Sequence, residues 1–226
     1  MELETLSSGS NGNCYILNHK GKSIILDCGM RFEDITHSKA FKGFKNTQLV
    51  ITTHHHSDHN RALEKFERSG CEIISYKTLK PKVEYHTCDS WTITTFPVQH
   101  NADNWGFIFK HKDIAEKFCY VTDFYGLPKI EGIDHWLIEV NYIESIVDKM
   151  IEEERLNEMH TGFNFHNSLE KTKEYFSNIQ TKPKTILCCH LSGMYGIDDI
   201  ILKELQPFAD KVEIARGGHK WKREAD

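Results

Sequence analysis

Residues 53–59 read Thr-His-His-His-Ser-Asp-His and directly follow the apolar run 49–52. The ligand-type side chains of this stretch form an H-x-H-x-D-H pattern, and they are His54, His56, Asp58 and His59. Imidazole and carboxylate groups together suit Zn²⁺, Mn²⁺ or Fe ions, and a second ligand set elsewhere would complete a two-metal site. A strand that ends in such a cluster is poorly explained by packing, so the stretch predicts a metal centre. The alternative is a solvated polar loop in a chain that contains 14 histidines.

The length and composition predict one globular domain over residues 1–226. The chain is 39% hydrophobic and 27% charged, which is enough for a sizeable buried core. No apolar run approaches the length of a membrane span, so we expect no membrane association. The first residues, 1–6, are acidic and do not resemble a secretion signal, which favours a cytoplasmic protein.

Charge and cysteine content bear on two further properties, which are nucleic-acid binding and disulfide formation. The formal net charge is −5, so the overall charge does not predict a protein that coats nucleic acid, although a local basic patch stays possible. The seven cysteines are odd in number and include no C-x-x-C pair. We therefore expect reduced, buried cysteines rather than a disulfide framework.

Periodicity predicts an α/β (α+β) protein in which strands dominate the first half of the chain. Short apolar runs between turn residues predict strands over 3–6, 14–17, 23–27, 48–52, 71–75, 91–98, 106–110, 118–122, 136–140, 185–189 and 212–215. Helical spacing predicts helices over 58–66, 143–158, 167–179 and 197–205. A charged tail follows the last strand. This order of elements favours two sheets with helices on their outer faces.

Ligand-type side chains recur where these predicted strands end. They are Asp27, the 54–59 cluster, His100, Asp123, Glu139, Asn141 and His190. Strand ends in a layered α/β domain converge on one edge, where ligands usually bind. A single histidine in such a place is most often a structural polar group, but several together favour a metal site.

The strand-end motifs, taken in the order in which they occur along the chain, resemble those of the metallo-β-lactamase superfamily. The resemblance covers nearly the whole chain. It implies a four-layer αβ/βα sandwich of two mixed sheets flanked by helices, with two divalent metal ions, Zn or Mn, between the sheets. One ion would be held by His54, His56 and His100. The other would be held by Asp58, His59 and His190, and Asp123 would bridge both. Asp27 matches the aspartate that orients the histidine loop.

Two ions that share a water molecule lower its pKa from ~15.7 toward ~7, which gives a metal-bridging hydroxide at neutral pH. Asp58 is our candidate to accept a proton from the attacking water. True β-lactamases commonly carry Cys where Asp123 stands, which makes antibiotic hydrolysis a poor match.

Four segments resemble the YycJ/WalJ-type proteins, a branch related to ribonuclease Z. They are 6–15, 97–107, 122–128 and 137–141. A fifth segment, Phe165-His166-Asn167-Ser168, is a partial match to a motif that opens a helix in that branch. By this resemblance, His166 would contact the scissile phosphate or protonate the leaving oxygen. The alternative is a surface histidine on an amphipathic helix.

The resemblance implies a metal-dependent phosphodiester hydrolase that acts on DNA or RNA, in an exonuclease-like manner, or on a nucleotide. A phage-type cyclic-nucleotide phosphodiesterase is an alternative within this class. A glyoxalase II-like thioesterase or lactonase is a second alternative, and a metal-stabilised binding protein without activity is a third. Relatives are often dimers, so a homodimer is expected by analogy alone. The arm of ribonuclease Z and the β-CASP insertion have no counterpart in the sequence.

Overall fold

The computed structural model describes residues 1–153 and 162–224, and within them the strands form a six-stranded and a seven-stranded sheet. The six-stranded sheet has the order β13 (Lys220–Lys222), β1 (Glu2–Ser7), β2 (Cys14–His19), β3 (Lys22–Leu26), β4 (Thr47–Thr52) and β5 (Ile73–Ser75). Its β3, β4 and β5 are parallel, whereas β13, β1, β2 and β3 pair antiparallel. The sheet is therefore mixed, and the carboxyl ends of β3 and β4 lie side by side.

The seven-stranded sheet is also mixed. Its order is β12 (Lys211–Ile214), β11 (Thr185–Cys189), β10 (His135–Glu139), β9 (Lys117–Val121), β8 (Asn104–His111), β7 (Trp91–Val98) and β6 (Glu84–Cys88). The strands β9, β10, β11 and β12 are parallel, so their carboxyl ends share one edge. The strands β6 to β9 pair antiparallel.

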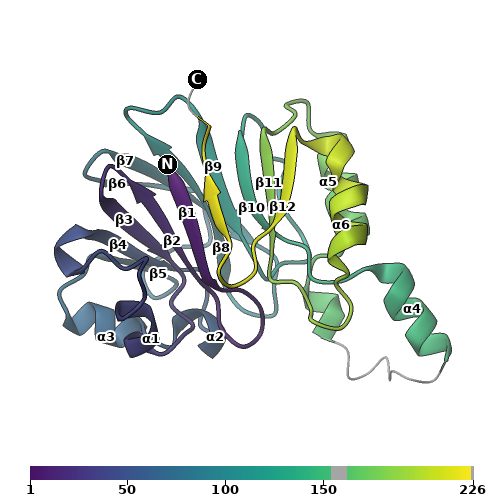
Figure 1. Cartoon of the computed structure of the whole chain (residues 1–226), viewed down its shortest axis with the longest axis horizontal. Coiled ribbons are helices and arrows are strands. Elements are labelled where there is room, and N and C mark those ends of the chain that lie inside the picture. The colour runs from purple at the N-terminus through teal and green to yellow at the C-terminus, as the bar shows by residue number, and fades with distance from the viewer. Residues whose placement is uncertain (154–161, 225–226) are drawn as a thin grey trace.

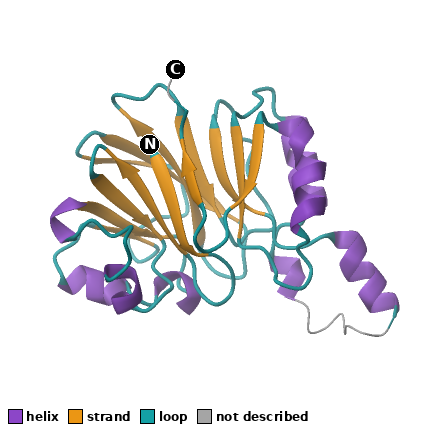
Figure 2. Ribbon diagram, viewed as in Figure 1, coloured by secondary structure: helices purple, strands orange, loops and turns teal. Residues whose placement is uncertain are grey.

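The two sheets pack face to face, with helices on both outer sides (Figures 1 and 2). Apolar side chains from both sheets, such as Leu17 and Phe107, form the core between them. The outer face of the six-stranded sheet packs against α1 (Phe32–Thr36) and α3 (Leu63–Arg68). The outer face of the other sheet packs against α5 (Leu169–Asn178) and α6 (Asp198–Leu205). The predicted four-layer metallo-β-lactamase sandwich is thereby confirmed.

The remaining helical segments are short or lie at the periphery. They are α2 (Ser57–Asn60), α4 (Glu144–Glu152) and the 3₁₀ turns η1 (Phe44–Asn46), η3 (Gly162–Phe165) and η4 (Gln206–Phe208). The helix predicted over 143–158 corresponds to α4, and its last residues, 154–158, lie outside the described residues. No helix in residues 1–153 or 162–224 combines the length and apolar character needed to cross a membrane.

The helix predicted over 58–66 is wrong as a single element, because it divides into α2 and α3. Two hydrogen bonds from the loop after β3 interrupt it: Cys28 N–H donates to the His59 carbonyl, and Ala62 N–H donates to the Cys28 carbonyl. Gly29 allows the two backbone segments to lie this close, since a Cβ there would be 1.6 Å from the Asp58 carbonyl oxygen. The loop and the histidine cluster are therefore locked together.

The predicted charged tail is also wrong, because part of it forms the edge strand β13. Lys220–Lys222 pairs with β1, and the Trp221 side chain is buried against the core between the sheets. The pattern Lys-Trp-Lys alternates as a half-buried strand should, but three residues are too few for a periodicity to be detected. The strand β6 and the helix α1 were likewise not predicted.

Candidate metal centre

Three of the predicted strand-end residues adopt a left-handed backbone. Asp27, Asp123 and His190 follow β3, β9 and β11, and their φ angles are 54°, 52° and 51°. Few non-glycine residues adopt this conformation, although Asp, Asn and His are enriched among those that do. Such conformations cluster at functional sites, where the surrounding structure holds them in place. In all three cases the side chain is buried between the two sheets.

A first group of ligand atoms gathers around the Asp123 carboxylate. His54, His56, His100 and Asp123 each offer one atom, and these atoms all lie within 4.8 Å of one another. From Asp123 Oδ2, the distance to His54 Nε2 is 3.5 Å and the distance to His100 Nε2 is 3.9 Å. His56 Nδ1 lies 2.9 Å from His54 Nε2. The structure thus brings together the four residues predicted for one ion.

A second group uses the same aspartate. Asp58, His59, Asp123 and His190 also offer four atoms within 4.8 Å of one another. His59 Nε2 lies 3.3 Å from both Asp58 Oδ2 and Asp123 Oδ2, and His190 Nε2 lies 3.7 Å from Asp58 Oδ2. Asp123 is therefore common to both groups, and all seven predicted ligands lie at one place.

The second ring nitrogen of several histidines is held by an acceptor. His54 Nδ1 is 3.0 Å from Thr53 Oγ1, and His100 Nδ1 donates to the Phe165 carbonyl at 3.0 Å. His59 Nδ1 donates to Asp27 Oδ2 at 2.6 Å. Contacts of this kind fix the ring orientation and the tautomer of metal-binding histidines, and they leave the opposite nitrogen free to bind a metal.

Asp27 organises this layer of contacts without lying in either ligand group. Its carboxylate accepts the Thr53 backbone N–H at 2.8 Å and the Tyr120 hydroxyl at 2.6 Å, besides the His59 ring. All four residues are fully buried. Asp27 therefore sets the position of the histidine loop, the role that the resemblance implied.

Three observations indicate that the ligand atoms of the two groups fit divalent metal ions. Zn²⁺ ligands lie at about 2.0–2.2 Å, so tetrahedral ligand atoms are separated by about 3.3–3.6 Å. The separations of 3.3–3.9 Å between the carboxylate oxygens and the imidazole nitrogens are close to that spacing. Among the described residues, His100 Nε2 and His190 Nε2 are buried without a hydrogen-bond partner. A nitrogen and oxygen donor set of this kind suits Zn²⁺ or Mn²⁺.

Electrostatics in the centre favour a cation. Burial alone would raise the pKa of Asp123, but His190 and His59 hold this pKa well below its usual range. Burial alone would lower the pKa of His190, but the carboxylates of Asp123 and Asp58 raise it to about 10. Burial does lower the pKa of His54, which keeps this imidazole neutral and able to coordinate. Two ionised carboxylates therefore face the imidazoles.

A buried carboxylate at the end of β10 links His166 to this centre. Glu139 Oε1 accepts His166 Nδ1–H at 2.7 Å and lies 3.0 Å from His190 Nδ1. The two imidazole rings stack with centroids 5.4 Å apart and an interplanar angle of 18°. Burial alone would lower the pKa of His166, but Glu139 raises it above its usual value. His166 precedes α5 and lies beside the ligand groups, not on an exposed helix face.

The predicted site did not include Glu139, Asn13 or Tyr120. Glu139 had a signal, since it is a carboxylate at the end of a strand. Asn13 lies in the segment 6–15, where its side chain closes the loop by accepting Gly9 N–H and donating to the Gly9 carbonyl. Its Nδ2 also lies 3.0 Å from His59 Nε2. Tyr120 had no signal, because its position in a buried strand is that of a core residue.

Two cavities differ in whether a predicted ligand lines them. One, of about 570 Å³, reaches His100 and includes Tyr125 in its wall. Tyr125 and Phe165 are 41% and 40% exposed, and their ring centroids lie 6.3 Å apart. Aromatic side chains of this kind offer a stacking surface to a planar group.

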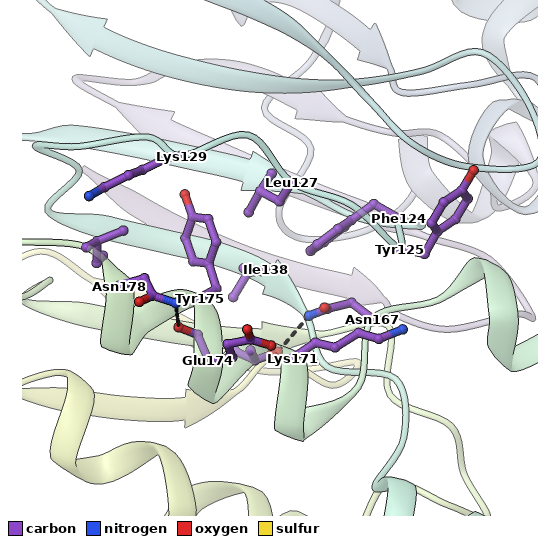
Figure 3. Close-up of a pocket in the computed structure, with 12 residues that line it drawn as sticks. Phe124, Tyr125, Leu127, Lys129, Ile138, Asn167, Lys171, Glu174, Tyr175 and Asn178 are labelled. Atoms are coloured by element: carbon purple, nitrogen blue, oxygen red, sulfur yellow. Dashed lines mark hydrogen bonds between the residues drawn. The ribbon is translucent and has the colours of Figure 1, made fainter.

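The other cavity, of about 380 Å³, lies between α5 and the loop after β9 (Figure 3). Phe124, Leu127 and Tyr175 point toward it, while the ammonium groups of Lys129 and Lys171 stand at its opposite ends. None of the seven predicted ligands lines this cavity. The cavity beside His100 is therefore the closer match to a substrate site.

Comparison with known proteins agrees with this geometry. A family model described as "Metallo-beta-lactamase superfamily" matches residues 8–76. No curated protein sequence gives a significant match. The Bacillus subtilis metallo-beta-lactamase fold protein YhfI is similar in structure with a TM-score of 0.72 at 15% identity, over 98% of this chain and 99% of that chain.

Two other solved structures of full-length coverage share the fold. Human tRNase Z, short form, has a TM-score of 0.66 at 13% identity, over 100% of both chains. Unliganded yeast PDE1 has a TM-score of 0.64 at 14% identity, over 97% of this chain and 98% of that chain. At these identities the likeness establishes the fold.

Proposed function

We propose that this chain, which has the metallo-β-lactamase fold and matches the superfamily model over residues 8–76, is a metal-dependent phosphodiester hydrolase acting on DNA, RNA or a nucleotide. The observation that carries the proposal is the arrangement of two ligand groups around a shared Asp123, with the Glu139–His166 pair beside them. Bound divalent ions would supply water activation and neutralise charge on the phosphoryl oxygens. The seven residues named above would hold them.

His166 is the residue that favours a phosphodiester over a thioester. An alkoxide leaving group needs a proton as the bond breaks, whereas a thiolate, with a pKa near about 8.5, departs without one. Glu139 accepts Nδ1–H of His166, so the ring is oriented and its Nε2 is available to donate to a leaving oxygen. The side chain is 22% exposed, which leaves it accessible to a substrate.

Asp58 is the candidate for the other proton transfer, in which the attacking water loses a proton. The Asp58 carboxylate contacts His59 and His190, and 23% of its side chain is exposed, whereas the Asp123 side chain is buried. Burial alone would raise the pKa of Asp58, but contacts with His190 and His59 hold it far below its usual range. This low pKa keeps the carboxylate ionised and able to bind the second ion. It also makes Asp58 a weak base, so its assignment as acceptor of a proton from the attacking water rests on its exposed position.

The exposed pair of Tyr125 and Phe165 supports a substrate that carries a nucleobase. The Phe165 carbonyl accepts from His100, so this aromatic surface is fixed relative to the centre. Stacking of a base on an aromatic side chain contributes about 1–3 kcal/mol and tolerates any sequence. The same fold occurs in the proteins named tRNase Z and PDE1, which is compatible with this proposal.

The test is a substrate panel on metal-loaded protein. We expect turnover of bis(p-nitrophenyl) phosphate with Mn²⁺ or Zn²⁺, and of at least one of end-labelled DNA, end-labelled RNA or a cyclic nucleotide. His56→Ala should abolish it, because the variant removes one ligand, while His37→Ala, an exposed histidine, is the matched control. Cleavage of S-lactoylglutathione with every phosphodiester left intact would assign the protein to the thioesterase class instead. Inactivity toward all esters at full metal occupancy would leave a binding protein.

A further inference from the structure

A separate group of ligand-type side chains lies at the opposite end of the sandwich. His19 and His111 are the last residues of β2 and β8, and Asp113 follows two residues after His111. The other end of β8 contacts the candidate metal centre, since the Asn104 amide donates to the Asp123 carbonyl. Seven residue steps of about 3.3 Å place His111 about 23 Å from Asn104, so the two locations are separate.

The three side chains converge on one point. One nitrogen of each ring and one Asp113 oxygen lie within 4.8 Å of one another, and the ring centroids of His19 and His111 are 4.3 Å apart. His111 Nδ1 lies 3.9 Å from Asp113 Oδ2 and accepts the Asp113 backbone N–H at 3.1 Å. The accepted hydrogen bond shows that His111 Nδ1 is unprotonated, and a metal ion that binds this nitrogen would take the place of the Asp113 N–H.

An independent observation points to a missing partner. Among the residues that the structure describes, the buried Nε2 of His19 has no hydrogen-bond partner. Buried polar groups in folded proteins are nearly always paired, so an unpaired one calls for an explanation. Packing explains only the ring positions, since Trp91 lies 4.8 Å from His111 and 6.2 Å from His19 between ring centroids. It leaves the His19 nitrogen unpaired.

We propose that His19, His111 and Asp113 form a separate site for a single divalent transition-metal ion such as Zn²⁺, Ni²⁺ or Cu²⁺. Two imidazoles and one carboxylate are a donor set that these ions prefer, and water completes the coordination because Asp113 is 39% exposed. The histidines come from different sheets, so the ion links the two layers of the sandwich. An ion that binds the folded chain alone stabilises it.

The ion pair of Lys20 with Asp113 provides a specific test of the proposal. The Lys20 ammonium forms this ion pair at 2.5 Å and therefore competes with a metal ion for the carboxylate. Lys20→Gln should tighten metal binding, because it removes the competing cation. Asp113→Asn should weaken it by on the order of tenfold, because it removes the negative charge. A purely structural ion pair would give neither change.

The decisive measurement is the Ni²⁺ content of the full-length protein after equilibrium dialysis. We expect His19→Ala to hold one ion fewer per chain than the wild type, and His37→Ala, an exposed histidine, to match the wild type. Circular dichroism checks that each variant is folded. Equal Ni²⁺ content in all three proteins would overturn the proposal. If His19→Ala does not fold, the affinities of Asp113→Asn and Lys20→Gln decide, and unchanged values in both would overturn it.

A second readout locates the ion. Cu²⁺ bound at this site lies beside Trp91 and should quench its fluorescence. The part of the quenching that Trp91→Phe removes comes from Trp91, and His19→Ala should remove the same part. If His19→Ala retains it, the ion lies elsewhere and the site is refuted. Neither outcome depends on hydrolytic activity, so the proposal stands or fails independently of the function of the main centre.

Discussion

One carboxylate oxygen of Glu139 serves two imidazoles with different expected tasks. It contacts His190, a predicted metal ligand, and His166, the proposed proton donor, at 3.0 and 2.7 Å. The other oxygen accepts the Phe124 and Asn167 backbone N–H groups, which fixes the carboxylate in the buried interior. Glu139 is therefore a positioning residue for both imidazoles, and its charge would couple metal binding to the proposed proton transfer.

If His166 protonates the leaving oxygen, its replacement should matter only when the leaving group needs a proton. We expect His166→Gln to lower kcat by about 10²–10⁴-fold on a dinucleotide or nucleic-acid substrate. The same variant should retain most of its activity on bis(p-nitrophenyl) phosphate, because p-nitrophenolate leaves unaided. Steady-state kinetics on both substrates measure the difference. An equal loss on both would assign His166 to phosphate binding, and His55→Ala, an exposed residue of the motif, is the control.

The candidate ligand residues could be predicted from sequence because each one lies at the end of a strand or in the segment that directly follows it. Asp123 and His190 stand where an apolar run stops, and the pattern of parallel strand ends brings them to one edge. Tyr120 could not be predicted, because its hydroxyl reaches Asp27 across the core from the other sheet. A contact between residues 93 apart in sequence leaves no local pattern.

At the scale of the element, the start of α5 determines where His166 lies. Ser168 is the N-cap of this helix: its hydroxyl accepts the Lys171 backbone N–H at 3.1 Å and donates to Glu144 Oε1 at 2.6 Å. The Leu169 N–H donates to the Tyr142 carbonyl, which ties the same turn to the segment before α4. The helix start is thus held from two sides.

Loss of this cap should destabilise the fold. We expect Ser168→Ala to lower the free energy of unfolding by about 1–2 kcal/mol, since the buried hydroxyl satisfies a helix N–H and binds Glu144. Urea denaturation followed by circular dichroism measures the change. Ser177→Ala, which removes an exposed hydroxyl bonded to the preceding turn of the same helix, should change stability by less than about 0.5 kcal/mol. Equal effects in both variants would contradict the role of the cap.

Element boundaries were the least predictable feature because tertiary contacts set them. Apolar spacing over 58–66 is helical, yet hydrogen bonds with Cys28 divide the segment at residues 61 and 62. Local propensity cannot anticipate a partner from another strand. By contrast, α5 and α6 have helical spacing and pack against a sheet along their length, so their existence was predicted.

At the scale of the whole molecule, a charged cluster holds the end of the sandwich opposite the metal centre. Glu116, just before β9, accepts from Lys184, from Arg223 at 2.9 Å and from His135 at 3.1 Å. These partners come from the starts of β10 and β11 and from the end of β13. One carboxylate therefore joins strands of both sheets.

This cluster should make stability depend on pH. Burial alone would raise the pKa of Glu116, but its cationic partners lower it to about 2. A depressed folded-state pKa means that the stabilisation is present above the unfolded value of about 4.3 and is lost as pH falls toward 2. Glu116→Gln should lower the free energy of unfolding by about 1–2 kcal/mol at pH 7 and by much less near pH 2.5. Denaturation at both values tests this, with exposed Glu67→Gln as the control.

The left-handed backbone at Asp27, Asp123 and His190 restricts which residues these positions can exchange during evolution. A β-branched side chain would be disfavoured at each by sterics alone, before any loss of coordination. Asn and Gly would suit the backbone but would remove a charge or a ligand. Two independent constraints, the left-handed backbone and the side-chain chemistry, therefore limit these three positions to a few residue types. Related chains that vary their chemistry should do so at His166, Tyr125 and Phe165, where no positive φ imposes such a limit.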